Sequence, residues 1–125
     1  MVSKVTLRSD ALCILVVEDD PMVRLFIAGY LRDQGYPVVE ADTGEAAVSL
    51  LRVEPRPPIR VVFTDIQLGG ELSGWDVAEA FRISYPDIRV IYASGRYHDG
   101  ERRVPDSVFF TKFPNDIVDA IAEAA

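Results

Sequence analysis

The chain of 125 residues has too few cysteines and histidines for several common kinds of site. It contains one cysteine, Cys13, and one histidine, His98. A single cysteine excludes an intrachain disulfide and a cysteine-based zinc site, and a single histidine excludes a histidine cluster. The longest apolar run, Ala11 to Val17, is far shorter than the ~20 residues that a transmembrane helix needs. Met1 to Asp10 lacks the apolar block of a signal peptide. These absences predict a cytoplasmic protein with no membrane segment.

Basic residues are also outnumbered. The chain has 13 Lys and Arg against 20 Asp and Glu, which gives a net charge of −7. Nucleic-acid-binding proteins usually present a basic face, so direct binding to DNA or RNA is not expected. The hydrophobic content of 49% is too high for a disordered chain. We therefore expect one folded domain over residues 1–125, with an ordered core over about 11–124 and no output domain.

Apolar segments alternate with helical patterns along the whole chain. The predicted strands are Leu12–Val17, Val38–Val39, Arg60–Thr64, Ile88–Tyr92 and Val108–Thr111. Helices are expected to begin after Asp20, after Asp42 or Thr43, at Trp75, and at Pro114 or Asn115. This alternation predicts an α/β fold of the (βα)5 type, a doubly wound, flavodoxin-like sheet of five parallel strands with helices on both faces.

Two helical regions allow more detailed predictions. In the first helix the apolar residues recur at spacings of three and four, which predicts one inward face; they are Val23, Phe26, Ile27, Tyr30 and Leu31. The segment 95–106 has few apolar residues and contains Gly95, Gly100 and Pro105, which disfavour a helix. This composition predicts that the fourth helix is short or irregular and packs only loosely against the rest of the domain.

Polar residues follow the predicted strands. The first strand ends in Glu18-Asp19-Asp20, the third in Asp65, the fourth in Ser94 and the fifth in Lys112. Parallel sheets of this class bind ligands at the carboxyl ends of their strands. Carboxylates gathered there would repel one another, and a divalent cation would relieve that repulsion. Oxygen-only ligands suit a hard ion such as Mg²⁺.

Four segments carry a family resemblance. They are Leu15-Val16-Val17-Glu18-Asp19-Asp20-Pro21, Val62-Phe63-Thr64-Asp65-Ile66-Gln67-Leu68, Tyr92-Ala93-Ser94-Gly95 and Phe109-Phe110-Thr111-Lys112. Asp65 lies 46 residues after Asp19, Ser94 lies 29 residues further on, and Lys112 follows 18 residues later. With these motifs in this order, the chain resembles the receiver domain of a two-component response regulator over essentially its whole length.

The resemblance implies roles for the residues at the strand ends. Glu18 and Asp19 would form the acidic pair that holds Mg²⁺, and Asp65 would be the phosphoacceptor. The backbone carbonyl of Gln67 would complete the metal site. Asp20 is instead interpreted as the N-cap of the first helix.

Three further residues match the family's switch and phosphate-binding positions. Ser94 would be the switch hydroxyl, Phe109 the switch aromatic residue and Lys112 the phosphate-binding lysine. The family usually has Lys-Pro with a cis bond, whereas this chain has Lys112-Phe113-Pro114. A cis bond before a residue other than proline costs ~3 kcal/mol, so we predict a trans Lys112–Phe113 bond.

The resemblance also implies a function and partners. Asp65 would receive a phosphoryl group from a phosphohistidine on a sensor histidine kinase or a histidine phosphotransfer protein, and the domain would then bind a downstream protein target. Such a domain is not a conventional enzyme, although it catalyses its own phosphorylation and slow dephosphorylation. A weak homodimer is left open.

Three other interpretations compete with this one. A flavodoxin-like FMN-binding protein would need a Ser-, Thr- or Gly-rich loop after the first strand, where this chain has three acidic residues. A phosphohydrolase with an Asp nucleophile would usually have a second acid two residues later, where this chain has Gln67. The alternative we retain is a receiver-like binding module that signals without phosphorylation.

Overall fold

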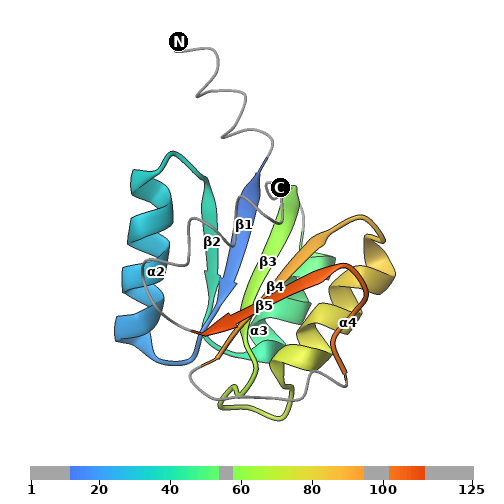
Figure 1. Ribbon diagram of the computed structural model, residues 1–125. Helices are drawn as coiled ribbons and strands as arrows, with labels where there is room; N and C mark the ends of the chain where they lie inside the picture. The colour runs from blue at the N-terminus through green and yellow to red at the C-terminus, as the bar shows by residue number, and fades with distance from the viewer. Residues whose placement is uncertain (1–11, 54–57, 95–101, 112–125) are drawn as a thin grey trace.

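The computed structural model describes residues 12–53, 58–94 and 102–111 (Figure 1). Within them lies a parallel sheet of order β2-β1-β3-β4-β5. Its strands are β1 (Cys13–Val17), β2 (Val38–Ala41), β3 (Ile59–Asp65), β4 (Arg89–Ser94) and β5 (Ser107–Thr111). The predicted doubly wound sheet is therefore confirmed. Each predicted strand is present, with its ends displaced by at most two residues.

Helices cover both faces of the sheet, because β1 and β3 bury apolar side chains on each side. Helix α2 (Pro21–Asp33) covers one face (Figure 1). Helix α3 (Gly44–Ser49), continued by the 3₁₀ turn η1 (Leu50–Arg52), and helix α4 (Gly74–Ser84) cover the other. A fully buried aliphatic side chain contributes roughly 1.5–3 kcal/mol. The interior strand β1, whose residues are all buried, thus contributes strongly to the core, and Cys13 belongs to that core.

Helix α2 begins and ends as its sequence dictates. The side chain of Asp20 caps its N-terminus, and Gly35, just past its end, has a φ of 97° that suits glycine. The buried residues of α2 are Ile27, Ala28 and Leu31. The prediction that Phe26 faces inward is wrong, since its side chain is 52% exposed. The buried face of α2 includes Ala28 in place of Phe26.

The two helices on the other face of the sheet, α3 and α4, begin within one residue of the predicted positions. Thr43 is the N-cap residue of α3, where it accepts a hydrogen bond from the amide of Ala46. Helix α4 buries the side chains of Val77, Ala78 and Phe81 against the sheet. Trp75 is half-buried over the core, with its ring centroid 4.8 Å from that of Tyr92. Tyr92 is fully buried on β4.

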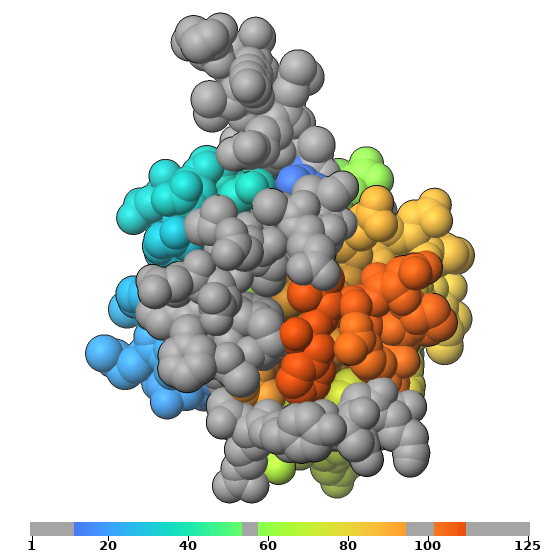
Figure 2. Space-filling view, in the orientation of Figure 1, coloured from blue at the N-terminus to red at the C-terminus, as the bar shows by residue number. Residues whose placement is uncertain are grey.

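The described part of the connection between β4 and β5, residues 102–106, has no helix. The rest of the segment predicted to form a short or irregular helix lies outside the described residues. The residues of the described part other than Val104 are exposed, and it lies beside α4 (Figure 2). Loose attachment of the whole connection stays a prediction, although this part has contacts with α4 and β4. Arg102 forms ion pairs with Asp76 and Glu79 of α4, each at 2.9 Å. The hydroxyl of Tyr92 accepts a hydrogen bond from the buried amide of Val104 at 3.0 Å.

Several sequence predictions lie outside the described residues: Lys112 and the Lys112–Phe113 bond, the helix expected from Pro114 or Asn115, and the first part of the β4–β5 connection, 95–101. Among the described residues, no helix has the length and apolar character needed to cross a membrane.

Candidate functional site

Three carboxylates gather at the carboxyl ends of β1 and β3, the lower edge of the sheet in Figure 1. Glu18, Asp19 and Asp65 each offer an oxygen atom, and these oxygens all lie within 4.8 Å of one another. Glu18 and Asp65 are buried, whereas Asp19 is exposed. Buried like charges repel strongly, and a cation between them would remove that cost. The donor set is all oxygen and partly open to solvent, which fits a hard divalent ion.

The sheet register explains why these residues meet. Val17 pairs with Thr64, so the residues that follow, Glu18 and Asp65, leave neighbouring strands at the same level. Asp65 itself pairs with Ala93, the residue before Ser94. Ser94 is 3% exposed and pairs with Thr111 of β5. The structure thus brings the three predicted carboxylates together and places Ser94 at the same edge of the sheet.

The backbone around Asp65 is held by short hydrogen bonds. The Oδ1 atom of Asp65 accepts the amide proton of Ile66 at 2.7 Å, and the hydroxyl of Thr64 donates to the carbonyl of Asp65 at 2.8 Å. The amide of Gly74 donates to the carbonyl of Ile66 at 2.7 Å and closes the loop between β3 and α4. These bonds fix one oxygen of the Asp65 side chain relative to the sheet.

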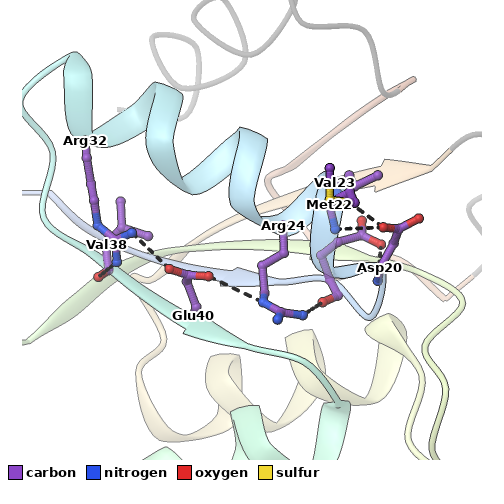
Figure 3. A network of polar contacts seen from close by, with 8 residues as sticks. Asp20, Met22, Val23, Arg24, Arg32, Val38 and Glu40 are labelled. Carbon is purple, nitrogen blue, oxygen red and sulfur yellow. Dashed lines mark hydrogen bonds and ion pairs between the residues drawn. The ribbon is translucent and has the colours of Figure 1, made fainter.

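The start of helix α2 holds Glu18 of the acidic pair in place through hydrogen bonds (Figure 3). Asp20 is its N-cap, as predicted, with Oδ1 accepting the amides of Met22 and Val23 at 2.9 and 3.2 Å. The backbone amide of Asp20 donates to Oε2 of Glu18 at 3.2 Å. Arg24 donates to the carbonyl of Glu18 at 2.9 Å (Figure 3).

Arg24 is one of two arginines of α2 that pair with one carboxylate of β2. Its Nε lies 3.4 Å from Glu40, which also pairs with Arg32 at 2.9 Å (Figure 3). The role of Arg24 could not be predicted from the sequence, because no local pattern pairs an arginine with a carbonyl six residues earlier.

The loop from Ile66 to Ser73 passes beside the carboxylates. Gln67, whose carbonyl is the predicted metal ligand, is exposed and lines an open hollow together with Trp75. A Cβ placed on Gly69 would lie 3.5 Å from Oδ2 of Asp19, so the loop runs close to the acidic pair. The carboxylate of Glu45 accepts hydrogen bonds from this loop. Sequence reasoning missed that contact, since it joins residues far apart in the chain.

The predicted switch aromatic residue, Phe109, lies on β5 opposite Tyr92. It is half-buried, and its ring centroid is 6.4 Å from that of Tyr92. Lys112, the predicted phosphate-binding residue, follows β5 directly but lies outside the described residues.

A model of the response regulator receiver domain family matches residues 14–104. The chain belongs to this family. The match spans the acidic pair, Asp65 and Ser94, and it confirms the resemblance read from the sequence.

Curated relatives of the receiver family include much longer proteins. An NtrX-like response regulator of Rickettsia typhi is 36% identical over 84 residues, which cover 66% of this chain but 17% of that protein. The sensor kinase CckA of Brucella abortus is 31% identical over 114 residues, which cover 90% of this chain and 12% of that protein. This chain therefore spans less than a fifth of the length of these relatives.

Solved structures of the same fold cover the chain more fully. A response regulator receiver protein from Sinorhizobium medicae is 28% identical, with a TM-score of 0.81 and 91% of each chain covered. TrrA from Thermotoga maritima, solved in complex with Mg²⁺ and beryllofluoride, is 24% identical. Its TM-score is 0.75, with 91% of this chain and 99% of that chain covered. The receiver fold predicted from the sequence is thus confirmed.

Proposed function

We propose that this receiver domain accepts a phosphoryl group on Asp65 from a phosphohistidine donor and switches protein binding in two-component signalling. One observation carries the proposal: the carboxylate oxygens of Glu18, Asp19 and Asp65 lie within 4.8 Å of one another at the ends of adjacent strands. Membership of the receiver family favours this function over a binding module that is never phosphorylated.

The proposed reaction is a transfer to a carboxylate. One oxygen of Asp65 attacks phosphorus and forms the new P–O bond, while the P–N bond to the donor imidazole breaks and that nitrogen takes a proton from solvent. Such transfers depend mainly on positioning and charge neutralisation. Glu18, Asp19, Asp65 and the carbonyl of Gln67 would hold Mg²⁺, which supplies positive charge to neutralise the phosphoryl oxygens.

The remaining site residues would contact the phosphoryl group itself. Lys112 would pair with the phosphoryl group, since its ammonium is a compact charge on a long stem. Ser94 would donate a hydrogen bond to a phosphoryl oxygen, a contact that exists only once the group has arrived. A contact that forms only in the phosphorylated protein shifts the equilibrium between its inactive and active conformations. Phe109 would be the aromatic residue that changes position in this switch.

The donor is expected to be a sensor histidine kinase or a histidine phosphotransfer protein, in the cytoplasm. Its imidazole must reach Asp65, so its surface must approach the first turn of α2, which follows the acidic pair directly. That turn exposes Met22 and Leu25, at 73% and 63%, an apolar surface suited to a protein donor. The same reaction would make the domain a catalyst of its own phosphorylation and slow dephosphorylation. Binding of a downstream protein target would follow.

Phosphorylation by a small phosphodonor tests the proposal. The protein is incubated with Mg²⁺ and acetyl phosphate, and its intact mass is measured, together with that of Asp65→Asn and Asp42→Asn. Asp42 is a matched control because it follows β2 at the same edge of the sheet, is exposed and lies outside the carboxylate cluster.

The wild-type protein and Asp42→Asn should each gain the mass of one phosphoryl group, and Asp65→Asn should gain none. Equal incorporation in Asp65→Asn would show that the phosphoacceptor is another residue. A failure of all three proteins to react would favour the binding module that signals without phosphorylation.

A further inference from the structure

Glu45 lies in the first turn of α3 but is bonded to the loop between β3 and α4. Its Oε2 atom accepts the backbone amide protons of Glu71 at 2.8 Å and Leu72 at 3.2 Å. These donors lie 26 and 27 residues further along the chain. One carboxylate oxygen therefore joins two elements that are otherwise separate in sequence.

Two glycines show how closely α3 and the loop approach each other. A Cβ on Gly44 would lie 2.8 Å from the Cβ and the carbonyl oxygen of Leu72, and a Cβ on Gly70 would collide with the carboxylate of Glu45. Among the described glycines only Gly35 has a positive φ. Position 44 therefore needs glycine because a Cβ would meet the backbone of Leu72, whereas a Cβ at position 70 would meet only the end of the Glu45 side chain.

The segment held by Glu45 is the one that carries the proposed metal ligand. The ends of the loop are closed by the hydrogen bond from Gly74 to Ile66, and Glu45 holds the loop between them, at residues 71 and 72. Gln67 and Gly70 line one hollow, and the backbone at Gly69 passes beside Asp19. Gln67 belongs to the same loop and lies two residues after Asp65, so movement of the loop would change where its carbonyl lies relative to the carboxylates.

The bonds made by Glu45 are charge-assisted. Hydrogen bonds from its own backbone amide, and then from Glu71 and Leu72, hold the pKa of Glu45 below its ordinary value. The carboxylate is therefore ionised at neutral pH, and hydrogen bonds to an ionised acceptor are stronger than those to a neutral one.

We propose that Glu45 is a positioning residue for the metal site: by its bonds to residues 71 and 72 it holds the loop in the arrangement that lets the carbonyl of Gln67 act as a ligand. The inference rests on the proposed function, since it assumes that the cluster binds a divalent cation. Groups of this kind, which orient ligands without touching the ion, typically change metal affinity by about 10- to 100-fold when removed.

The test uses three variants and one matched control. Glu45→Ala removes the acceptor, and Glu45→Gln keeps a neutral acceptor oxygen. Gly70→Ala leaves the charge of Glu45 in place but forces its carboxylate off the loop. The control, Glu71→Gln, removes one negative charge from the same loop, and the Glu71 side chain has no hydrogen bond or ion pair shown among the described residues.

Two readouts are measured on the full chain. The first is hydrogen exchange at the amides of Glu71 and Leu72 without metal. The second is the dissociation constant for Mg²⁺, from titration of the fluorescence of Trp75, the one tryptophan of the chain, which lines the same hollow as Gln67. Calorimetric titration gives an independent value.

We expect Glu45→Ala and Gly70→Ala to speed exchange at both amides and to weaken Mg²⁺ binding by about tenfold relative to the control. Glu45→Gln should lie between them and the wild type. The double variant Glu45→Ala/Gly70→Ala should be no weaker than Glu45→Ala, because both changes break the same contact.

Equal Mg²⁺ affinity of Glu45→Ala and Glu71→Gln, with the amides exposed only in the former, would overturn the inference and leave the proposed function intact. If Glu45→Ala fails to fold, Glu45→Gln and Gly70→Ala decide the question. Absence of Mg²⁺ binding in the wild-type protein would instead overturn the proposed function, and this inference with it.

Discussion

Gly74 lies where α4 begins, directly against the backbone of the proposed phosphoacceptor. A Cβ at this position would collide with the carbonyl oxygen of Asp65 and lie 2.8 Å from the Cα of Ile66. Both neighbours are backbone atoms, which cannot rotate away as a side chain can. Glycine at position 74 therefore allows the start of α4 to close the loop over the site.

Gly74→Ala should lower the free energy of unfolding by about 1–3 kcal/mol, the usual cost of forcing a methyl group into a packed site. The control is Gly29→Ala, in the middle of α2, where a Cβ would meet nothing within 4 Å. That change should raise stability by about 0.5–1 kcal/mol, since alanine favours a helix. Urea denaturation measures both, and equal stability of Gly74→Ala and the wild type would contradict the packing argument.

The carboxyl group of Asp76 makes the stability of the fold depend on pH. Its pKa is held below its ordinary value, first by the backbone amide of Ser73 and then by Arg102. The folded state therefore binds fewer protons than the unfolded state, and stability rises with pH through that range. The contribution is complete above the unfolded pKa, about 3.9, and is lost as the pH falls through the folded value. The side chain is 33% exposed, so solvent screening keeps the contribution below about 1 kcal/mol.

Asp76→Asn should therefore destabilise the protein at pH 7 and have a smaller effect near pH 3. Denaturation curves of both proteins between these pH values measure the difference. A difference that grows as the pH falls would contradict the lowered pKa of Asp76 in the folded state.

At the scale of elements, the connection between β4 and β5 has more contacts with the rest of the fold than its composition predicts. Its composition predicts loose attachment, because only Tyr97 and Val104 are clearly apolar in it. The second half is nevertheless anchored: Arg82 donates to the carbonyl of Pro105 at 2.6 Å, and Val104 is buried with its amide bonded to the hydroxyl of Tyr92. Burial also raises the pKa of Tyr92, so the hydroxyl remains protonated at neutral pH.

Tyr92→Phe leaves the buried amide of Val104 without its partner, which should cost about 1–3 kcal/mol. Hydrogen exchange at Val104 should accelerate more than exchange at the amides of α4. Tyr30→Phe is the control, since no hydrogen bond of the half-buried Tyr30 hydroxyl is shown among the described residues. Unchanged exchange at Val104 in Tyr92→Phe would show that this hydroxyl does not hold the connection.

At the scale of the whole molecule, the features that could be predicted are those that a periodic pattern encodes. Continuous apolar runs predicted the buried strands, and a polar residue after each run predicted that Glu18, Asp65 and Ser94 would share one edge. The parallel arrangement of the strands followed from their alternation with helices. The carboxylate cluster was thus predictable from the sequence.

The unpredicted features depend on packing between distant segments. Glu45 appears in the sequence as an ordinary acidic residue in the first turn of a helix, and only the fold brings it to the amides of residues 71 and 72. The exposure of Phe26 likewise depends on which side of α2 meets the sheet. Arg102 gains its partners only when the connection folds back on α4.

The most direct test is the Mg²⁺ dependence of phosphorylation in variants of two neighbouring residues, Asp19 and Asp20. Asp19→Asn removes a carboxylate of the cluster. Asp20→Asn removes the same charge from an exposed cap, and asparagine caps a helix as well as aspartate does. The rate of phosphoryl incorporation from acetyl phosphate is measured against Mg²⁺ concentration. The account predicts a rate that saturates with Mg²⁺ in the wild type and in Asp20→Asn, with a midpoint raised about tenfold or more in Asp19→Asn. Incorporation without Mg²⁺, or the same midpoint in both variants, would contradict it.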